Sequence, residues 1–324
     1  MSRAPLKRLI VVSILVASFA SPSLAETSLF GEADVPLRGD TVSAEPFVGF
    51  LRGTAGEYVY SAANPKTKIS QLDWSVNTLV VGGRLAVRPF DNLTLRGRFW
   101  ASVSSDGDMK DYDYFGGFYG KDSWTHKSTH SDTRLGRTWQ ADGSVAWAYY
   151  GGPDLALTAI AGFRHYQVEY NAYGGSYLYS TSAFRDTPGS FSPGELGISY
   201  RQTWQTPYVG LGAAYNGPNW AVSAEVIGSP FVMARDRDYH ALRTTLFKGE
   251  LETTSMVGFS AGMEYRLSDM FSISGRLDYQ YFLQARGGTT IVDGSTGIVT
   301  RVPSPSAGAD ADMLTFTLGA KMRI

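Results

Sequence analysis

The sequence contains 324 residues, of which 29 are Lys or Arg and 30 are Asp or Glu, so its formal net charge is −1. This balance lacks the basic footprint that nucleic-acid binding requires, and we expect no nucleic-acid partner. Cysteine is absent, which excludes disulfides, thiolate metal ligands and cysteine catalysis. With 36 Gly, 19 Tyr and only 18% charged residues, the composition favours an all-β chain.

Residues 1–25 have the organisation of a secretory signal peptide. Three basic residues precede an apolar run from Leu9 to Ala20, and Ser23 and Ala25 fit a cleavage site directly after Ala25. The run is too short to span a bilayer, and no later window holds ~18 consecutive apolar residues. We therefore expect residues 26–324 to be exported as one domain, either a soluble periplasmic protein or an outer-membrane barrel.

An alternation of apolar and polar residues favours the barrel. In residues 314–324 every second residue is apolar, and Thr, Gly, Lys or Arg stands between them. The same period of two recurs in 93–104, 257–266 and 271–281, which is typical of strands with two different faces. A soluble sandwich would also alternate. Here, however, the polar face carries Arg, Asp and Glu, which suit a polar lumen, and aromatic residues gather near the strand ends, as in interfacial girdles.

Short turns and long loops also alternate along the chain. Turn signals occur at 89–92, 151–154, 216–219 and 267–270. Longer polar stretches occur near 61–68, 106–137, 173–194, 240–249 and 286–309. This rhythm predicts an all-β fold, a ten-stranded antiparallel transmembrane β-barrel with both termini on the short-turn side. The expected strands are 42–60, 69–88, 93–106, 138–150, 154–172, 195–215, 220–238, 250–266, 271–285 and 310–323. Several exceed the ~9–11 residues that cross a bilayer, so the barrel should project above the membrane.

Ionisable residues gather at the long-loop end of this predicted barrel. They end the first strand, lie in the second long loop and end the seventh strand: Glu57, Asp111, Asp113, Asp236, Asp238 and His240. Because Asp238 and His240 are two residues apart, they share one face of an extended strand, where a carboxylate can orient an imidazole.

In the seventh predicted strand, the apolar residues and the acidic residues imply opposite orientations for the even-numbered side chains. Its outward apolar residues are even-numbered up to Val226, yet the acids and the histidine that should point inward are even-numbered too. A bulge at Gly228-Ser229-Pro230 would reset the face of the strand. We therefore predict that Phe231 and Met233 point outward and that the acids point into the barrel.

Several short motifs then carry a family resemblance. They include Ser70-Gln71-Leu72-Asp73-Trp74, Gly174-Gly175-Ser176-Tyr177 and Pro207-Tyr208, in this order along the chain. With them, nearly the whole mature chain resembles the omptins, outer-membrane aspartyl-type endopeptidases of Gram-negative bacteria. The resemblance implies a ten-stranded barrel in the outer membrane whose active site faces the exterior.

The resemblance also implies a catalytic set. The family's Asp pair matches Asp111 and Asp113, and its Asp–His dyad matches Asp238 and His240. A water held between the two sides would attack the scissile carbonyl. His240 would be the general base, oriented by Asp238. Neither a metal nor another cofactor is implied.

The family's primary substrate pocket matches four further residues. Its acids match Glu57 and Asp236, and its apolar walls match Met109 and Ile198. Because a buried cationic group requires paired carboxylates, this pocket favours polypeptide substrates with Arg or Lys before the cleaved bond.

The chain departs from the family pattern in places. Well-known members have an acid at the position of His126, which favours a basic residue after the cleaved bond as well, so a strict dibasic preference is not implied. On the outer wall, Gln167 and Thr203 occupy two positions of the family's lipopolysaccharide-binding basic residues, with Arg164 and Arg201 nearby. The sequence leaves open whether lipopolysaccharide activates this protein.

The sequence also predicts where two further histidines lie, and it leaves two functions other than proteolysis open. His130 matches a family position near the site, and His165 is expected in the wall or lumen of the barrel. Because fold does not fix function, a non-catalytic adhesin or receptor barrel is an alternative. A diffusion pore is a weaker one, since ten strands enclose little space and inward charged residues would fill it.

Overall fold

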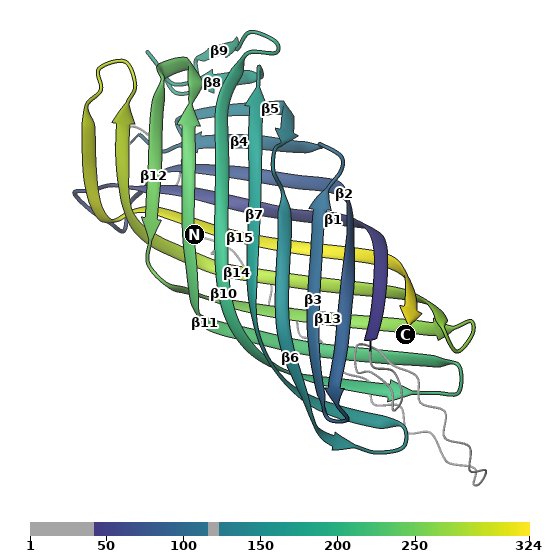
Figure 1. The fold of residues 1–324 in the computed structure, drawn as a ribbon. Helices are drawn as coiled ribbons and strands as arrows, with labels where there is room; N and C mark the ends of the chain where they lie inside the picture. Colours follow the sequence, from purple (N-terminus) through teal and green to yellow (C-terminus); the bar gives the residue numbers. More distant parts are fainter. Residues whose placement is uncertain (1–41, 116–122) are drawn as a thin grey trace, which may run out of the picture.

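The first and last strands pair with each other and close the sheet into a ring. Figure 1 shows the computed structural model, which describes residues 42–115 and 123–324. β1 (Val42–Tyr60) pairs with β2 (Lys68–Phe90) on one side and with β15 (Val299–Arg323) on the other. The predicted signal peptide and its cleavage site lie outside the described residues. In the ranges that are described, no helix is long and apolar enough to cross a membrane.

Ten strand positions follow one another around this ring in the described part of the chain, which confirms the predicted fold. Seven are continuous: β1, β2, β7 (Leu155–Tyr173), β10 (Leu196–Asn216), β11 (Trp220–His240), β14 (Phe271–Asp293) and β15. Three are each divided in two: β3 (Leu93–Ser102) with β4 (Gly107–Asp113), β5 (His126–Leu135) with β6 (Trp139–Gly151), and β12 (Thr245–Leu251) with β13 (Thr254–Arg266). The short strands β8 (Ser176–Tyr179) and β9 (Thr187–Ser190) and the 3₁₀ turn η1 (Ala241–Arg243) lie at one end.

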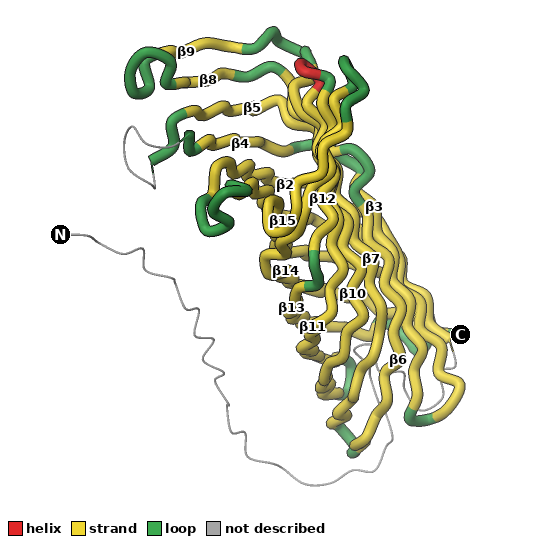
Figure 2. The backbone as a smooth tube through the Cα atoms, turned by 90° about the vertical axis from the view of Figure 1, so that its left-hand side faces the viewer, coloured by secondary structure: helices red, strands yellow, loops and turns green. Residues whose placement is uncertain are grey.

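Much of the chain predicted as long loops is strand. β4 and β5 occupy most of the described part of 106–137, β8 and β9 lie within 173–194, and β14 and β15 extend through much of 286–309. Figure 2 shows β4, β5, β8 and β9 at the upper end of the ring. Asp111 and Asp113 therefore lie on strand β4 and not on a loop. Their side chains therefore point to the same face of β4, because residues two apart on a strand share a face.

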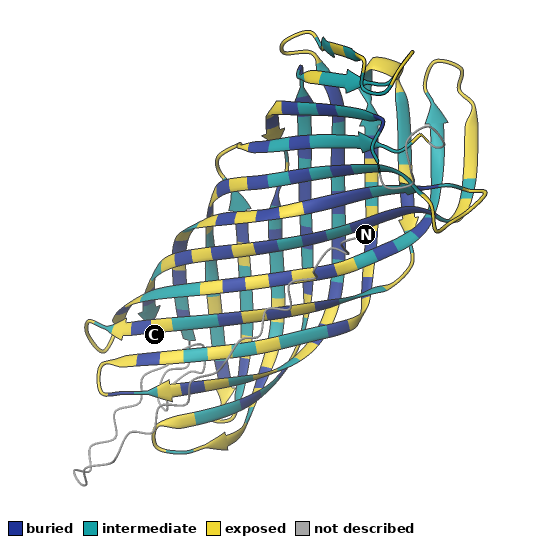
Figure 3. Ribbon diagram, turned by 180° about the vertical axis from the view of Figure 1, so that it is seen from behind, coloured by how far each residue is buried: buried dark blue, intermediate teal, exposed yellow. Residues whose placement is uncertain are grey.

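An apolar belt surrounds the ring. Phe271, Ile273 and Leu277 on β14 expose 49%, 51% and 39% of their surface, as the outward orientation predicts. Other strands contribute outward residues in the same way, such as Phe99, Phe259 and Phe316. Figure 3 shows the resulting alternation of exposed and buried residues along the strands. Because so large an apolar surface is unfavourable in water, this belt is the lipid-facing band of an outer-membrane barrel.

Strand β11 changes face where the sequence predicts a bulge. Its register against β13 shifts between Ser229 and Val232. Ala221, before the shift, and Val232, after it, are both buried although one is odd-numbered and the other even-numbered. The bulge therefore turns Asp236 and Asp238 toward the interior, which confirms the predicted change of direction.

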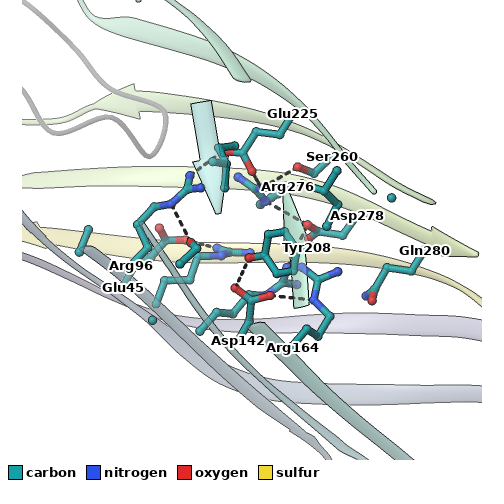
Figure 4. Close-up of a pocket in the computed structure, with 18 of the residues that line it drawn as sticks. Glu45, Arg96, Asp142, Arg164, Tyr208, Glu225, Ser260, Arg276, Asp278 and Gln280 are labelled. Atoms are coloured by element: carbon teal, nitrogen blue, oxygen red, sulfur yellow. Dashed lines mark hydrogen bonds and ion pairs between the residues drawn. The ribbon is translucent and has the colours of Figure 1, made fainter. Parts of the chain in front are cut away.

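The membrane level of the ring is filled by ion pairs. Arg98 and Arg276 pair with Asp278 at 2.9 and 3.1 Å, and Arg164 pairs with Asp142 at 2.7 Å. Figure 4 shows Asp142, Arg164, Arg276 and Asp278 among the side chains that converge in the interior. The space left between them is about 70 Å³, far below the ~300 Å³ of a small-molecule site. The described side chains therefore fill most of the interior at this level.

Candidate active site

A cavity of about 630 Å³ lies at the long-loop end of the ring. Strands β1, β2, β4, β5, β10 and β11, the turn η1 and the β14–β15 hairpin supply its walls. On β1 the apolar belt ends at Phe50 and Glu57 lines the cavity, and on β11 it ends at Met233 and Asp236 lines the cavity. The cavity therefore stands above the membrane-spanning part of the barrel.

The structure brings seven of the eight residues predicted for catalysis and substrate binding into this cavity: Glu57, Asp111, Asp113, Ile198, Asp236, Asp238 and His240. Met109 is the exception. It is fully buried in the hydrophobic core cluster, where it pairs in register with Trp74. Met109 is thus part of the packing around the cavity and does not line it.

Asp238 and His240 form a buried dyad. Asp238 Oδ2 lies 2.6 Å from His240 Nε2, and the two side chains are 5% and 20% exposed. The ring of Phe247 packs edge-on against the imidazole at 5.3 Å and restricts its orientation. The second carboxylate oxygen of Asp238 is buried and has no hydrogen-bond partner among the described residues. A buried carboxylate oxygen in this state is a natural acceptor for a water or a substrate N–H.

Asp111 and Asp113 form an acid pair on β4, which is held between β2 and β5. The Ser70 hydroxyl donates to Asp111 Oδ1 at 3.3 Å. Burial raises the pKa of both carboxyls, and the negative charges of Asp113 and Asp238 raise that of Asp111 further. Two interacting acids of this kind titrate as a set, so the pair is suited to hold and exchange a proton.

Glu57 and Asp236 form a second buried acid pair. Asp236 accepts hydrogen bonds from the Gly249 amide at 2.8 Å and from the Tyr200 hydroxyl at 3.4 Å. Glu57 Oε2 is buried without a hydrogen-bond partner among the described residues. Burial, and then the charge of Asp238, raises the pKa of Asp236 to about 7. The same causes raise the pKa of Glu57 well above its usual range. This pair would be stabilised by a cation between its carboxylates.

Two of the remaining histidines lie in different environments. His130 lines the cavity, with Nε2 3.0 Å from the Ser128 hydroxyl and its ring stacked on Phe191 at 5.1 Å. Burial lowers the pKa of His130, which favours the neutral imidazole. His165 stacks on Trp139 at 4.6 Å, and its neighbour Arg164 on the same strand is the residue that points into the lumen.

The cavity lining that sequence reasoning missed includes Phe115, Tyr179, Leu242 and Arg243. Arg243 belongs to η1 and follows the predicted histidine by three residues, the spacing of one helical turn, which is the signal that could have found it. Among the described residues, no group of three or more His, Asp or Glu is arranged to hold a metal ion.

Comparisons with known proteins agree with this geometry. The model of the omptin family matches residues 38–324. The plasminogen activator of Yersinia pestis is 27% identical over 98% of this chain and 99% of its own length. The outer membrane protease IcsP of Shigella flexneri is 30% identical over 80% of this chain and 83% of its own. The crystal structure of the outer membrane protease OmpT from Escherichia coli superposes with a TM-score of 0.84 at 24% identity, covering 90% of this chain and 100% of that one. The chain belongs to the omptin family.

Proposed function

We propose that this omptin is an outer-membrane endopeptidase of the aspartyl type that cleaves polypeptides after Arg or Lys. One observation carries the proposal. The Asp111/Asp113 pair, the Asp238–His240 dyad and the Glu57/Asp236 pair lie in one cavity at the long-loop end of the barrel. Long loops are extracellular in outer-membrane barrels, so substrates would enter from outside the cell.

In the proposed reaction, a water between the acid pair and the dyad attacks the scissile carbonyl. His240 takes the proton of that water, and Asp238 holds the imidazole through the 2.6 Å contact and stabilises the imidazolium that forms. Asp111 and Asp113 position the water and share a proton with the developing tetrahedral intermediate. Burial favours the protonated form of these carboxyls. His240 then gives its proton to the leaving amine as the C–N bond breaks.

The Glu57/Asp236 pair supports specificity for a basic residue before the cleaved bond. A guanidinium or ammonium group entering there would donate to the oxygen of Glu57 that lacks a partner. It would also offset the repulsion between two buried carboxylates. Ile198 lies in the same cavity and offers apolar surface to the aliphatic stem of the substrate side chain.

Lipopolysaccharide is proposed as a partner of the outer wall. Arg201, Arg237 and Lys248 are register partners on β10, β11 and β12, so they form a basic row across three strands. Arg201 also pairs with Glu169 at 2.6 Å. A row of cations above the apolar belt suits phosphate groups at the membrane surface. Arg164, by contrast, points into the lumen and takes no part in this row.

A cleavage assay tests the proposal. Refolded protein with lipopolysaccharide should cleave fluorogenic peptides after Arg and Lys, and His240→Ala and Asp111→Ala should each lose most of this activity. Heat-modifiable gel mobility would show whether each variant still forms the barrel. A folded His240→Ala variant with near-full cleavage would contradict the assigned base. A folded wild type that cleaves no peptide would favour a non-catalytic adhesin.

A further inference from the structure

The side chains around the small space at membrane level carry more positive than negative charge. Six cations line this space of about 70 Å³: Arg84, Arg96, Arg98, Arg164, Arg276 and Lys321. Four acids line it with them: Glu45, Asp142, Glu225 and Asp278. Figure 4 shows Arg96, Arg164 and Arg276 together with the four acids. The side chains that line the space therefore have an excess of two positive charges.

The neighbouring ion pairs toward the strand ends do not remove this excess. Lys321 pairs with Glu264 at 3.1 Å, and Glu264 also pairs with Arg323. This layer adds one acid and one further cation, so the difference between cations and acids stays the same. Arginine is charged at every ordinary pH. Because a buried charge without a compensating one is strongly destabilising, the space calls for a negative group.

Two of the arginines lie directly opposite each other. Arg84 on β2 and Arg98 on β3 are register partners. Both guanidinium groups lie near the ring of Phe47, at 4.4 and 5.8 Å from its centre. Side chains opposite each other on an antiparallel pair have Cβ atoms about 5 Å apart, and like charges in this position repel. A negative group between the two arginines would remove that repulsion.

Each of these two arginines also has a buried N–H group that no described residue accepts. The Arg84 side chain pairs with Glu45 and donates to the Thr317 hydroxyl at 2.6 Å through its terminal nitrogens. Arg98 pairs with Asp278 at 2.9 Å through Nη1. The Nε atoms of both arginines are buried and have no hydrogen-bond partner among the described residues. A buried donor of a charged group needs an acceptor, since leaving it unsatisfied costs free energy.

The space is separated from the active-site cavity by a layer of aromatic rings. The Tyr166 ring lies 6.1 Å from that of Trp100 and 6.2 Å from that of Phe282, which stacks on Trp204 at 4.7 Å. These four side chains are buried, and they come from β3, β7, β10 and β14. Lys321, by contrast, lines the space from near the end of β15 on the short-turn side. Short turns are periplasmic in outer-membrane barrels, so a ligand would enter from the periplasm.

We propose that this space is a binding site for a small inorganic anion of the halide class, held between Arg84 and Arg98. The anion accepts from the Nε–H groups of both arginines and neutralises part of the excess charge. A halide is spherical and accepts single N–H groups, whereas sulfate or phosphate is matched by the paired donors of a guanidinium fork. Here the terminal nitrogens already face Glu45 and Asp278. The bound ion would join β2 to β3 and stabilise the barrel, and it would take no part in peptide cleavage.

The test is urea unfolding of the refolded mature protein in a nonionic detergent, with gluconate replaced stepwise by chloride at constant ionic strength. We expect the midpoint to rise with chloride and then to level off, because a ligand that binds only the folded state stabilises it until the site is full. Gluconate is too large for the space and gives the baseline. Equal midpoints in chloride and gluconate overturn the proposal. Saturation by sulfate but not by chloride overturns the halide assignment.

Two variants with opposite changes of charge separate anion binding from a general loss of stability. Arg84→Gln removes a cation and one Nε donor, and should raise the chloride concentration at half-saturation by about tenfold or more. Asp278→Asn removes a neighbouring acid and should lower that concentration by about tenfold. Arg52→Gln, at an exposed position on β1, is the matched control and should leave it unchanged. A half-saturation that is the same in all three variants overturns the proposal.

Crystals grown with bromide in place of chloride provide a direct readout of the site. Anomalous scattering should place one bromide within hydrogen-bonding reach of the Nε atoms of both Arg84 and Arg98. A peak without anomalous signal in this position would identify a water and overturn the proposal.

Discussion

Asp238 and His240 occupy one face of β11 and meet at 2.6 Å, in a position that a bulge earlier in the same strand makes possible. The contact joins a carboxylate to one ring nitrogen and leaves the other nitrogen for the reaction. A strand without the bulge would direct both side chains to the outer wall, because residues of one parity share a face. The proposed catalytic dyad therefore depends on backbone geometry several residues away.

This contact leads to a first prediction. Asp238→Asn should lower kcat by about 10²–10⁴-fold, because an amide neither orients the required tautomer nor stabilises an imidazolium. Peptide cleavage measures the loss, with gel mobility as the check on folding. Asp132→Asn, in an exposed ion pair with Arg134, is the matched control and should retain activity. Equal rates for Asp238→Asn and wild type would exclude the dyad.

A second prediction concerns the buried acids of the primary pocket. Replacing Glu57 with Gln and Asp236 with Asn together should reduce cleavage after Arg by about 10²-fold, the cost of removing the partners of a buried cation. Cleavage after an uncharged residue should change much less, because its side chain makes no ion pair. Equal losses for both substrates would show that the two acids do not select the basic residue.

The raised pKa values of these acids give a third prediction, on pH. Asp236, with its pKa raised to about 7, holds a proton at mildly acidic pH, and burial raises the pKa of Glu57 in the same direction, whereas a cationic side chain binds the ionised forms. Binding must therefore release protons, and affinity should rise with pH by up to ~10-fold per unit for each proton released. Anisotropy of a labelled non-cleavable Arg peptide between about pH 5.5 and 8.5 measures this.

The control for this measurement is the same peptide with norleucine in place of Arg, whose affinity should vary little over the range. Asp236→Asn should flatten the profile of the Arg peptide. Tighter binding at low pH than at high pH would contradict the assignment, because the sign of the dependence follows directly from ionisation of the acids.

A fourth prediction concerns stability. Asp278 pairs with Arg98 and Arg276 inside the barrel. Asp278→Asn leaves buried Arg98 without its carboxylate and removes one of the two carboxylate partners of Arg276, which keeps Glu225 at 3.0 Å. It should lower the free energy of unfolding by about 3–5 kcal/mol. The exposed pair of Asp132 and Arg134 is a matched comparison, since solvent screens it and its loss should change the unfolding midpoint little. Urea unfolding of both variants in the same detergent would compare them, and equal midpoints would show that the network contributes nothing.

The sequence predicts the membrane part of this fold well, because lipid imposes a strict alternation there. Leu277 and Phe316 expose the faces that their spacing predicts. Above the membrane the alternation disappears, since both faces of the sheet are then polar or packed on neighbouring hairpins. For that reason β4 and β5 are read as loop from the sequence alone.

In the candidate site, too, strand periodicity predicts some residues and not others. Asp238 and His240 follow from the period of two and from the turn-forming residues of the bulge. Met109 shares a face with Asp111 but lies one strand step closer to the membrane, where it pairs with Trp74 in the core. Spacing alone cannot show at which depth the cavity ends. Arg243 reaches the cavity through a 3₁₀ turn, which strand periodicity does not describe.

The filled interior at membrane level has a consequence for the cell that displays this protein. Because paired charges such as Arg98 and Asp278 pack its centre, a polypeptide chain cannot pass through the barrel. In the proposed reaction, a substrate would therefore enter the cavity from the extracellular side, and both product fragments would leave on that side.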